Sequence, residues 1–193
     1  MGLFLIPLLT GFVFNWASAF TAFFTRRLGE RGGRAATFVM RNILGIPVWA
    51  FGLVMAVRQT SPPLFDPTPV TEILGWIPIG AGLVPMIWGL GLLGMRSFRP
   101  TSQDTLVNTG LYGRICHPIY CGALLEYLGI ALLHPTIPVV VACALCWGYI
   151  FVQACLEEID LKRRIPAYRA YMTQVPRFFP RLWKQQRTPI RGD

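Results

Sequence analysis

Charged residues are scarce in this sequence of 193 residues, and acidic ones are the scarcest, with nine Asp and Glu in all. Only 14% of the residues are charged, 53% are hydrophobic, and the mean hydropathy is +0.48. An ordinary soluble domain has about 25% charged residues and a smaller apolar share. The shortage of charge therefore excludes a soluble globular domain and indicates a membrane protein.

The sequence also lacks internal repeats, low-complexity tracts and any domain boundary before Cys155. It has no pattern of metal ligands either. Cys143 and Cys146 have the C-x-x-C spacing, but they stand among Val, Ala, Leu and Trp without a second ligand pair. A zinc or redox site is therefore disfavoured, no metal is expected, and the cysteines are predicted to be small buried apolar residues.

Basic residues lie almost entirely on one side of the predicted membrane topology. Of the 18 Lys and Arg residues, all but Arg58 fall in the loop after the first span, the loop after the third span, or the tail. Because Lys and Arg gather in cytoplasmic loops, this predicts an odd number of spans with the amino terminus outside and the carboxyl terminus in the cytoplasm. The net charge of +9 follows from the same bias, so no nucleic-acid partner is expected, although the tail can lie on anionic lipid.

Uncharged windows of about 20 residues locate the spans. We expect three helices at Leu3–Phe24, Ala35–Val57 and Ile73–Met95, followed by a helical hairpin within Ile119–Cys155 that is interrupted at His134–Pro138. The fold class is thus all-α, a polytopic membrane helix bundle of about five transmembrane helices with a cytoplasmic C-terminal cofactor-binding segment. The chain is expected to form a single domain, in which residues 1–95 hold the first three helices and residues 96–193 form the hairpin and tail.

Two local features of these spans lead to further expectations. Arg41 lies near the start of the second span, where a long side chain can snorkel to the head groups. The third span contains Pro78 and Pro85, which membrane helices tolerate. It is also rich in glycines that would let neighbouring backbones approach closely, namely Gly80, Gly82, Gly89, Gly91 and Gly94.

Three polar clusters contrast with the apolar background, and each has a structural alternative. His117-Pro118 fits a helix start, Glu157-Glu158 a solvated helix end, and Tyr168 with Tyr171, on one face of a short helix expected near Pro166, an interfacial aromatic anchor. A functional reading gains weight because the segments before and after the hairpin emerge on the same side of the membrane. They can therefore close over a shared site.

Two ordered motifs carry a family resemblance. The first is Leu106-Val-Asn-Thr-Gly110-Leu-Tyr112 followed by His117-Pro118-Ile-Tyr120-Cys-Gly122. The second is Glu157-Glu158, Tyr168-x-x-Tyr171 and Val175-Pro-Arg177-Phe-Phe-Pro180. Together they resemble the integral-membrane methyltransferases typified by isoprenylcysteine carboxyl methyltransferase and phosphatidylethanolamine N-methyltransferase, over about Leu106 to Trp183.

The resemblance implies an enzyme that transfers a methyl group from S-adenosylmethionine to a lipophilic small molecule or lipid that enters from the bilayer. It implies that the donor binds at the two motifs, with residues after Arg177 covering the site and Gly122 letting the ligand approach the backbone. The implied cofactor-binding residues are Leu106, Gly110, Tyr112, His117, Pro118, Tyr120, Gly122, Glu157, Glu158, Tyr168, Tyr171 and Arg177. Methyl transfer needs mainly positioning of donor and acceptor, so no nucleophilic side chain is expected.

Departures from the family pattern bear on the acceptor. Carboxyl methyltransferases of this type have an arginine before His-Pro, where this chain has Cys116, and Arg114 is the nearest guanidinium and a candidate catalytic residue. Whether Arg114 replaces the missing arginine stays open. Glu126 shares a helical face with Gly122 and Gly129, and an acid there favours an amine acceptor, whose proton it could take. The alternative is a neutral, hydrogen-bonded structural acid.

Other functions remain as alternatives. A carboxyl or thiol acceptor is possible within the same family. A sterol-type reductase that uses NADPH has a similar carboxyl-terminal region, but it typically has an acid after the glycine, where this chain has Ala123. A non-catalytic membrane scaffold or small transporter is the third reading. No obligate protein partner is expected, and a bacterial inner membrane fits the short external loops.

Overall fold

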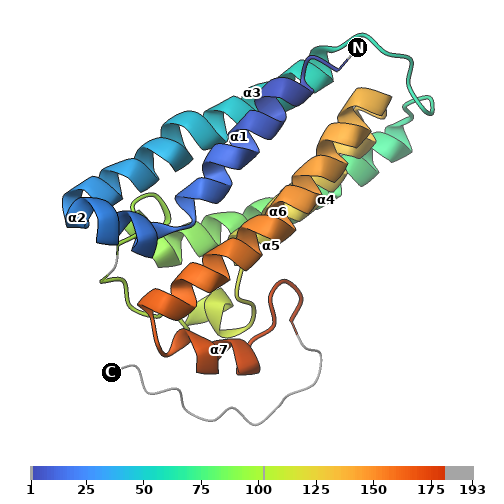
Figure 1. The fold of residues 1–193 in the computed structure, drawn as a ribbon. Helices are drawn as coiled ribbons and strands as arrows, with labels where there is room; N and C mark the ends of the chain where they lie inside the picture. The colour runs from blue at the N-terminus through green and yellow to red at the C-terminus, as the bar shows by residue number, and fades with distance from the viewer. Residues whose placement is uncertain (1, 102, 181–193) are drawn as a thin grey trace.

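The computed structural model describes residues 2–101 and 103–180, and these form a bundle of helices joined by shorter connections (Figure 1). Residues 181–183 of the expected family resemblance, and the last basic residues of the tail, lie outside the described residues. The all-α fold class is confirmed for the described part of the chain. We call the end of the bundle that carries residues 94–117 and 165–180 the tail end.

The first helical pair is α1 (Leu5–Ser18) and α3 (Ile46–Arg58), which lie side by side in Figure 1. They are connected by α2 (Thr21–Phe38), which kinks at Gly29, and by the π-helical turn η1 (Val39–Gly45). The two helices approach closely through glycine. A Cβ atom on Gly52 would lie 2.5 Å from the backbone nitrogen of Leu8, so no larger residue fits there without a shift.

The first expected span, Leu3–Phe24, is wrong in its extent, because the helix ends at Ser18 and a new one begins at Thr21. The break has a tertiary cause. Ser18 Oγ donates to the backbone oxygen of Asn15 at 2.6 Å, and the Asp160 carboxylate of a distant helix accepts the Ala22 backbone N–H at 2.8 Å. The apolar run alone gives no hint of this capping group, which lies 138 residues away.

The second helical pair is α4 (Pro69–Leu93), extended by the short 3₁₀ turn η2 (Gly94–Ser97), and α5 (Pro118–Leu133). Its contact is the most extensive between two elements in the described part of the chain. Of the glycines that were expected to allow close approach, Gly82 and Gly89 do so, whereas Gly80, Gly91 and Gly94 face open space. Both prolines inside α4, Pro78 and Pro85, are accommodated as predicted.

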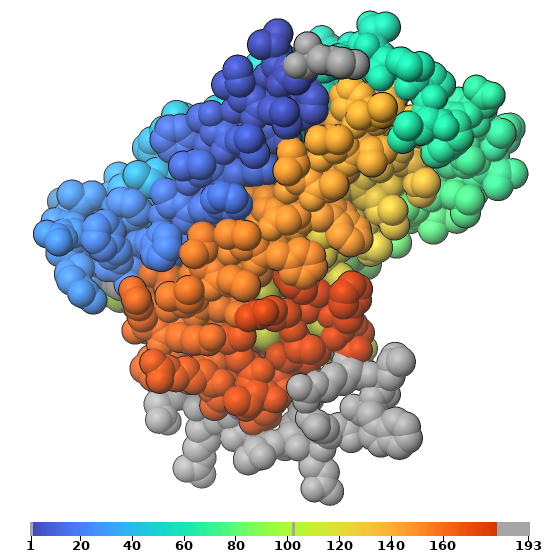
Figure 2. All heavy atoms as spheres, turned by 45° about the vertical axis from the view of Figure 1, so that its right-hand side comes forward, coloured from blue at the N-terminus to red at the C-terminus, as the bar shows by residue number. Residues whose placement is uncertain are grey.

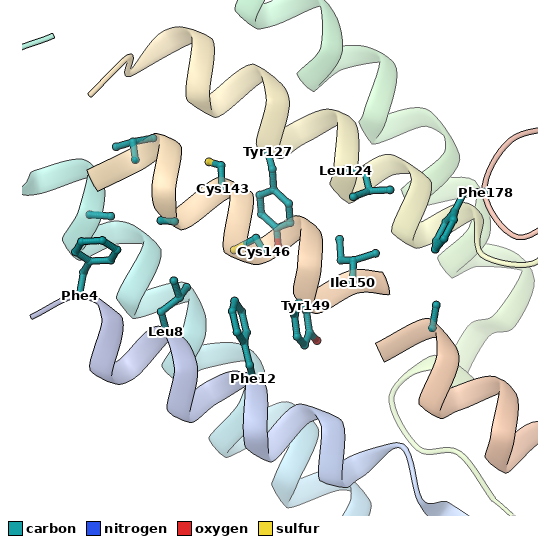
Figure 3. Packing of buried hydrophobic residues seen from close by; sticks show 14 residues of the cluster. Phe4, Leu8, Phe12, Leu124, Tyr127, Cys143, Cys146, Tyr149, Ile150 and Phe178 are labelled. Carbon is teal, nitrogen blue, oxygen red and sulfur yellow. The ribbon is translucent and has the colours of Figure 1, made fainter. Parts of the chain in front are cut away.

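Helix α6 (Ile137–Arg164) runs between the two pairs and forms the centre of the core. Figure 3 shows Phe12 of α1 on one side of α6 and Tyr127 of α5 on the other, with Tyr149 and Cys146 of α6 between them. Phe12 stacks on Tyr149 with ring centroids 4.4 Å apart. The prediction that the cysteines are buried is confirmed for Cys143 and Cys146, which are 4% and 0% exposed, and is wrong for Cys155, which is exposed.

The predicted hairpin and the short tail helix are both present. Helix α5 ends at Leu133 and α6 begins at Ile137. The turn between them contacts the loop between α3 and α4, residues 59–68, where the Leu64 N–H donates to the Pro135 oxygen at 2.6 Å. After α6 the chain forms α7 (Tyr168–Gln174), with both predicted tyrosines buried. Figure 2 shows the tail, in red, packed against the lower part of α6, in orange.

Three helical segments are long and apolar enough to cross a membrane, namely Thr21–Arg58, Pro69–Ser97 and Ile137–Arg164. Two shorter apolar helices, Leu5–Ser18 and Pro118–Leu133, accompany them. Many large apolar side chains on these helices point outward, for example Trp76 and Ile87 of α4, which are 63% and 62% exposed. Such an apolar exterior is expected of a membrane protein and abnormal for a soluble one.

Candidate active site

The two predicted motif segments meet at the tail end of the bundle. The chain before α5 is paired with the tail by two backbone hydrogen bonds, from the Cys116 N–H to the Pro176 oxygen at 2.8 Å and from the His117 N–H to the Arg177 oxygen at 3.0 Å. The Cys116 thiol also donates to the Val175 oxygen at 3.3 Å, and burial raises the pKa of this thiol to about 11. The expectation that these segments close together is therefore confirmed.

Glu158 holds the tail and the chain before α5 together. Its side chain is 1% exposed and accepts two hydrogen bonds from the Arg177 guanidinium, Nε to Oε1 at 2.7 Å and Nη2 to Oε2 at 2.8 Å. His117 Nε2 lies 3.2 Å from the same carboxylate. The hydrogen bond to Glu158 raises the pKa of Arg177. A bidentate pair of this kind fixes geometry as well as charge, so it holds the tail in place.

Tyr171 is a second residue that holds the tail against the chain before α5. Its hydroxyl donates to the Tyr112 oxygen at 2.5 Å, and its ring is 1% exposed beside Tyr168. Tyr168 and Tyr112 are also buried, and desolvation raises the pKa of both phenols, which therefore stay protonated at neutral pH. The interfacial-anchor reading of Tyr168 and Tyr171 is wrong, because both rings pack inside the protein against the chain that precedes α5.

Between these segments and the helices lies a cavity of about 530 Å³. At the tail end its walls include Arg41, Tyr112, His117, Glu157 and Tyr168. The cavity continues between α3, α4 and α5, where its lining is mostly apolar: Trp49, Leu53, Met86, Ala123, Glu126, Tyr127 and Ile130. One chamber thus has a charged part and an apolar part.

Arg41 and Glu157 form the charged part. Arg41 Nη2 donates to Glu157 Oε1 at 2.7 Å, and Gln153 Nε2 donates to the same oxygen at 3.0 Å. The side chains of Arg41 and Glu157 are only 15% and 18% exposed. The expected snorkelling of Arg41 to the head groups is therefore wrong. Its partner is an acid that lies 116 residues later in the chain.

Glu126 lies in the apolar part of the cavity. It follows Pro118, the first residue of α5, by eight residues, which corresponds to about 12 Å along the helix axis. Its Oε1 atom and the Nε1 atom of Trp49 are buried, and neither has a hydrogen-bond partner within the described residues. Because buried polar atoms are usually hydrogen-bonded, this unpaired oxygen makes Glu126 a candidate contact for a molecule bound in the cavity.

The cavity collects about half of the site residues predicted from the sequence. Those on its wall are Leu106, Tyr112, His117, Tyr120, Glu126, Glu157, Tyr168 and Tyr171. Those away from it are Gly110, Arg114, Pro118, Gly122, Glu158 and Arg177.

The residues away from the cavity have other positions. Gly110 has a φ of +57° and starts the 3₁₀ turn η3 (Gly110–Gly113). Pro118 is the first residue of α5, and Arg114 is exposed at the surface. Gly122 contacts the Gly82 backbone of α4, so the close approach at this glycine is made by a helix and not by a ligand.

Sequence reasoning missed several cavity residues from the first 58 positions, among them Asn15, Arg41 and Trp49. A charge inside an apolar span was the available signal for Arg41. Nothing in the sequence marks Asn15 or Trp49. The loop after α4 also closes on the cavity through Arg164, which pairs with Asp160 at 2.5 Å and Asp104 at 3.3 Å and contacts the Thr101 oxygen.

Comparison with known proteins is consistent with this site. The family model of phospholipid methyltransferases matches residues 73–164. The cobalt-zinc-cadmium resistance protein CzcN of Cupriavidus metallidurans is 27% identical over 150 residues, which cover 75% of this chain and 67% of that protein. The nickel-cobalt-cadmium resistance protein NccN of Alcaligenes xylosoxydans xylosoxydans is 25% identical over 151 residues, covering 76% and 68%.

No solved structure matches the chain. Within the described residues, no group of three or more His, Cys, Asp or Glu side chains is placed to hold a metal ion. The matched segment, residues 73–164, contains most of α4 and all of α5 and α6, and therefore most of the cavity wall. The sequence motifs predicted a membrane methyltransferase family, and the match to the phospholipid methyltransferase family over these residues confirms it.

Proposed function

We propose that this protein transfers a methyl group from S-adenosylmethionine to a lipophilic amine at the cytoplasmic face of a bacterial inner membrane. The observation that carries the proposal is a single cavity that joins the Arg41–Glu157 pair at the tail end to Glu126 deeper in the bundle, whose Oε1 has no hydrogen-bond partner in the described residues. A polar donor and an apolar acceptor need such a shared chamber, because the reacting atoms must come within about 3–3.5 Å.

The residues at the tail end fit the donor. Glu157 can accept the hydroxyls of a ribose or an ammonium group, and Tyr112, Tyr120 and Tyr168 offer aromatic surfaces for an adenine ring or a cation. The cavity volume of about 530 Å³ falls in the range of about 300–1,000 Å³ that is usual for small-molecule sites. When bound, S-adenosylmethionine supplies an electrophilic methyl group on a sulfonium.

Glu126 has the acceptor role in this proposal. An ionised carboxylate in an apolar wall attracts an ammonium group, and Oε1 is positioned to take an N–H proton because it has no partner in the described residues. Loss of that proton leaves a neutral amine with a free lone pair for attack on the methyl carbon. The apolar side chains around Glu126 would hold the hydrocarbon part of the same molecule.

The other acceptors are less well supported. A carboxylate acceptor would meet like charge at Glu126. Cys116, which takes the place of the arginine of carboxyl methyltransferases, donates its thiol proton to the Val175 oxygen and serves the closure of the tail. The exposed Arg114 does not line the cavity and so does not compensate for the missing arginine.

The test is mass spectrometry of lipid extracts incubated with the purified protein and a donor that carries an isotopically labelled methyl group. The label is expected on nitrogen. Glu126→Gln should lower product formation by about 10²- to 10⁴-fold, the usual contribution of a positioned acid or base, while donor affinity stays unchanged. The matched control is Glu72→Gln, because Glu72 is an exposed acid in the first turn of α4 and does not line the cavity.

Three results would overturn parts of this proposal. Full activity of Glu126→Gln would remove the acceptor role of that residue. Label on a carboxylate or a thiol would replace the amine. Binding of NADPH without binding of S-adenosylmethionine would replace the reaction.

A further inference from the structure

The guanidinium of Arg41 has more donors than the described residues use. Its Nε donates to Ser18 Oγ at 3.3 Å, Nη1 to the Ser97 oxygen at 3.0 Å and Nη2 to Glu157 Oε1 at 2.7 Å. Arginine has five N–H groups, so these bonds leave one hydrogen on Nη1 and one on Nη2. Both Arg41 and Glu157 line the cavity. One N–H group on each terminal nitrogen allows an arginine to bind both oxygens of a carboxylate.

The surroundings of Arg41 point to a ligand as well. Removing two charges from water is expensive, and an ion pair kept only for stability could be replaced by apolar residues at little loss. Arg41 also lies in the π-helical turn η1. Such turns are rare in proteins as a whole, but those that occur are often found at functional sites. The three partners that hold it come from α1, η2 and α6, so the guanidinium is fixed before any ligand arrives.

We infer that the Arg41–Glu157 pair binds the zwitterionic amino-acid end of the methyl donor. Arg41 takes the carboxylate through its two remaining N–H groups, and Glu157 takes the ammonium. The inference rests on the proposed function, and it adds a donor-binding residue that lies outside the matched family segment, residues 73–164. It also explains why a positive and a negative side chain stand together on the wall of one cavity.

The test compares three ligands that share the adenosine part and differ at the amino-acid end. S-adenosylhomocysteine carries both charged groups, decarboxylated S-adenosylmethionine lacks the carboxylate, and methylthioadenosine lacks the whole amino-acid end. Their dissociation constants are measured by calorimetry on the full chain in detergent. Arg41→Gln should weaken S-adenosylhomocysteine at least about tenfold, or about 1.4 kcal/mol. It should change the affinity of the other two ligands less than about twofold.

Two further variants make the result specific. Arg41→Lys keeps the charge but loses the fork, so it should recover part of the affinity for S-adenosylhomocysteine. If Arg41→Gln does not fold, Arg41→Lys decides, because it should still weaken S-adenosylhomocysteine relative to methylthioadenosine. Arg99→Gln is the matched control, since this exposed arginine lies over the Phe38 ring and does not line the cavity.

The failures of the two proposals are distinguishable. Equal weakening of all three ligands by Arg41→Gln would show that Arg41 only holds the helices together, and no weakening would show that it does not contact the donor. Either result would overturn the inference and leave the proposed function standing. Failure of the unaltered protein to bind S-adenosylhomocysteine would overturn the proposed function itself.

Discussion

The α1–α3 pair and the α4–α5 pair are built in the same way, yet only one of them could be recognised from its sequence. In each pair a glycine lets two helix backbones touch, Gly52 against Leu8 in the first and Gly122 against Gly82 in the second. The second pair carries part of the first family motif, Pro118 to Gly122, at the start of α5. The first carries none, but it supplies Arg41 and Trp49 to the same cavity.

The difference shows that the sequence motifs identify the residues on one wall of the cavity and give no signal for those on the opposite wall. Residues with fixed spacing around a helix start, such as His117, Pro118 and Tyr120, form a recognisable string because they are close in the chain. Arg41 acts across 116 residues of intervening sequence, so no local pattern records its partner. Variants that affect one helical pair and spare the other can test this division.

The largest effect is expected at Glu158. Glu158→Ala leaves the His117 and Arg177 side chains without their shared carboxylate, and each hydrogen bond to a charged group that is lost costs about 1.5–3 kcal/mol. The tail should detach, as measured by proteolytic cleavage within 165–180 and by thermal unfolding in detergent. Hydrogen exchange of residues 5–58 should stay as in the unaltered protein. Faster exchange throughout α1 and α3 would contradict the division between the two pairs.

A smaller effect should come from the glycine contacts, and it should be similar in the two pairs. Gly52→Ala and Gly122→Ala each place a methyl group against the backbone of the neighbouring helix, an overpacking that costs about 1–3 kcal/mol. The measurement is the free energy of unfolding. Gly80→Ala is the matched control, because a Cβ atom there meets nothing within 4 Å, and it should stabilise α4 by up to about 1 kcal/mol.

The smallest effect concerns Cys116. Because burial raises its pKa to about 11, the protonated thiol is favoured in the closed tail, and that contribution to stability is lost as the pH rises from about 9 through about 11. In a variant with Cys116 as its one cysteine, alkylation should be slow at pH 8 and should accelerate toward pH 11. Glu158→Ala should make it fast at pH 8. Equal rates with and without Glu158 would mean that the tail does not shield the thiol.

The sequence predicted much of the fold because its signals are local. The prolines of His134–Pro138 placed the α5–α6 turn, and the three-residue spacing of Tyr168 and Tyr171 placed one face of α7. The break at Ser18 was missed because Asp160, the partner that fixes it, comes from another helix. The apolar composition of the segment gave no indication of a stop.

The neighbouring acids Glu157 and Glu158 show the same limit within the site. The sequence assigned both to the cofactor. Successive residues of an α-helix point about 100° apart, so two adjacent side chains serve different surroundings. Glu157 faces the cavity and pairs with Arg41, whereas Glu158 faces the tail and pairs with Arg177. Which acid takes which role depends on the rotation of α6, and that rotation is set by packing along its whole length.

The attachment of the tail to the chain before α5 has a consequence for control of the protein in the cell. The wall that the tail provides is fastened by a few bonds at Cys116, His117 and Glu158, while the helices that hold the protein in the bilayer do not depend on them. Under the proposed function, a single cut by a protease between α6 and Val175 would leave this wall held by those bonds alone, so activity would be lost when they open while the protein stays in the membrane. The amount of protein in the membrane would then no longer determine the amount of methyltransferase activity.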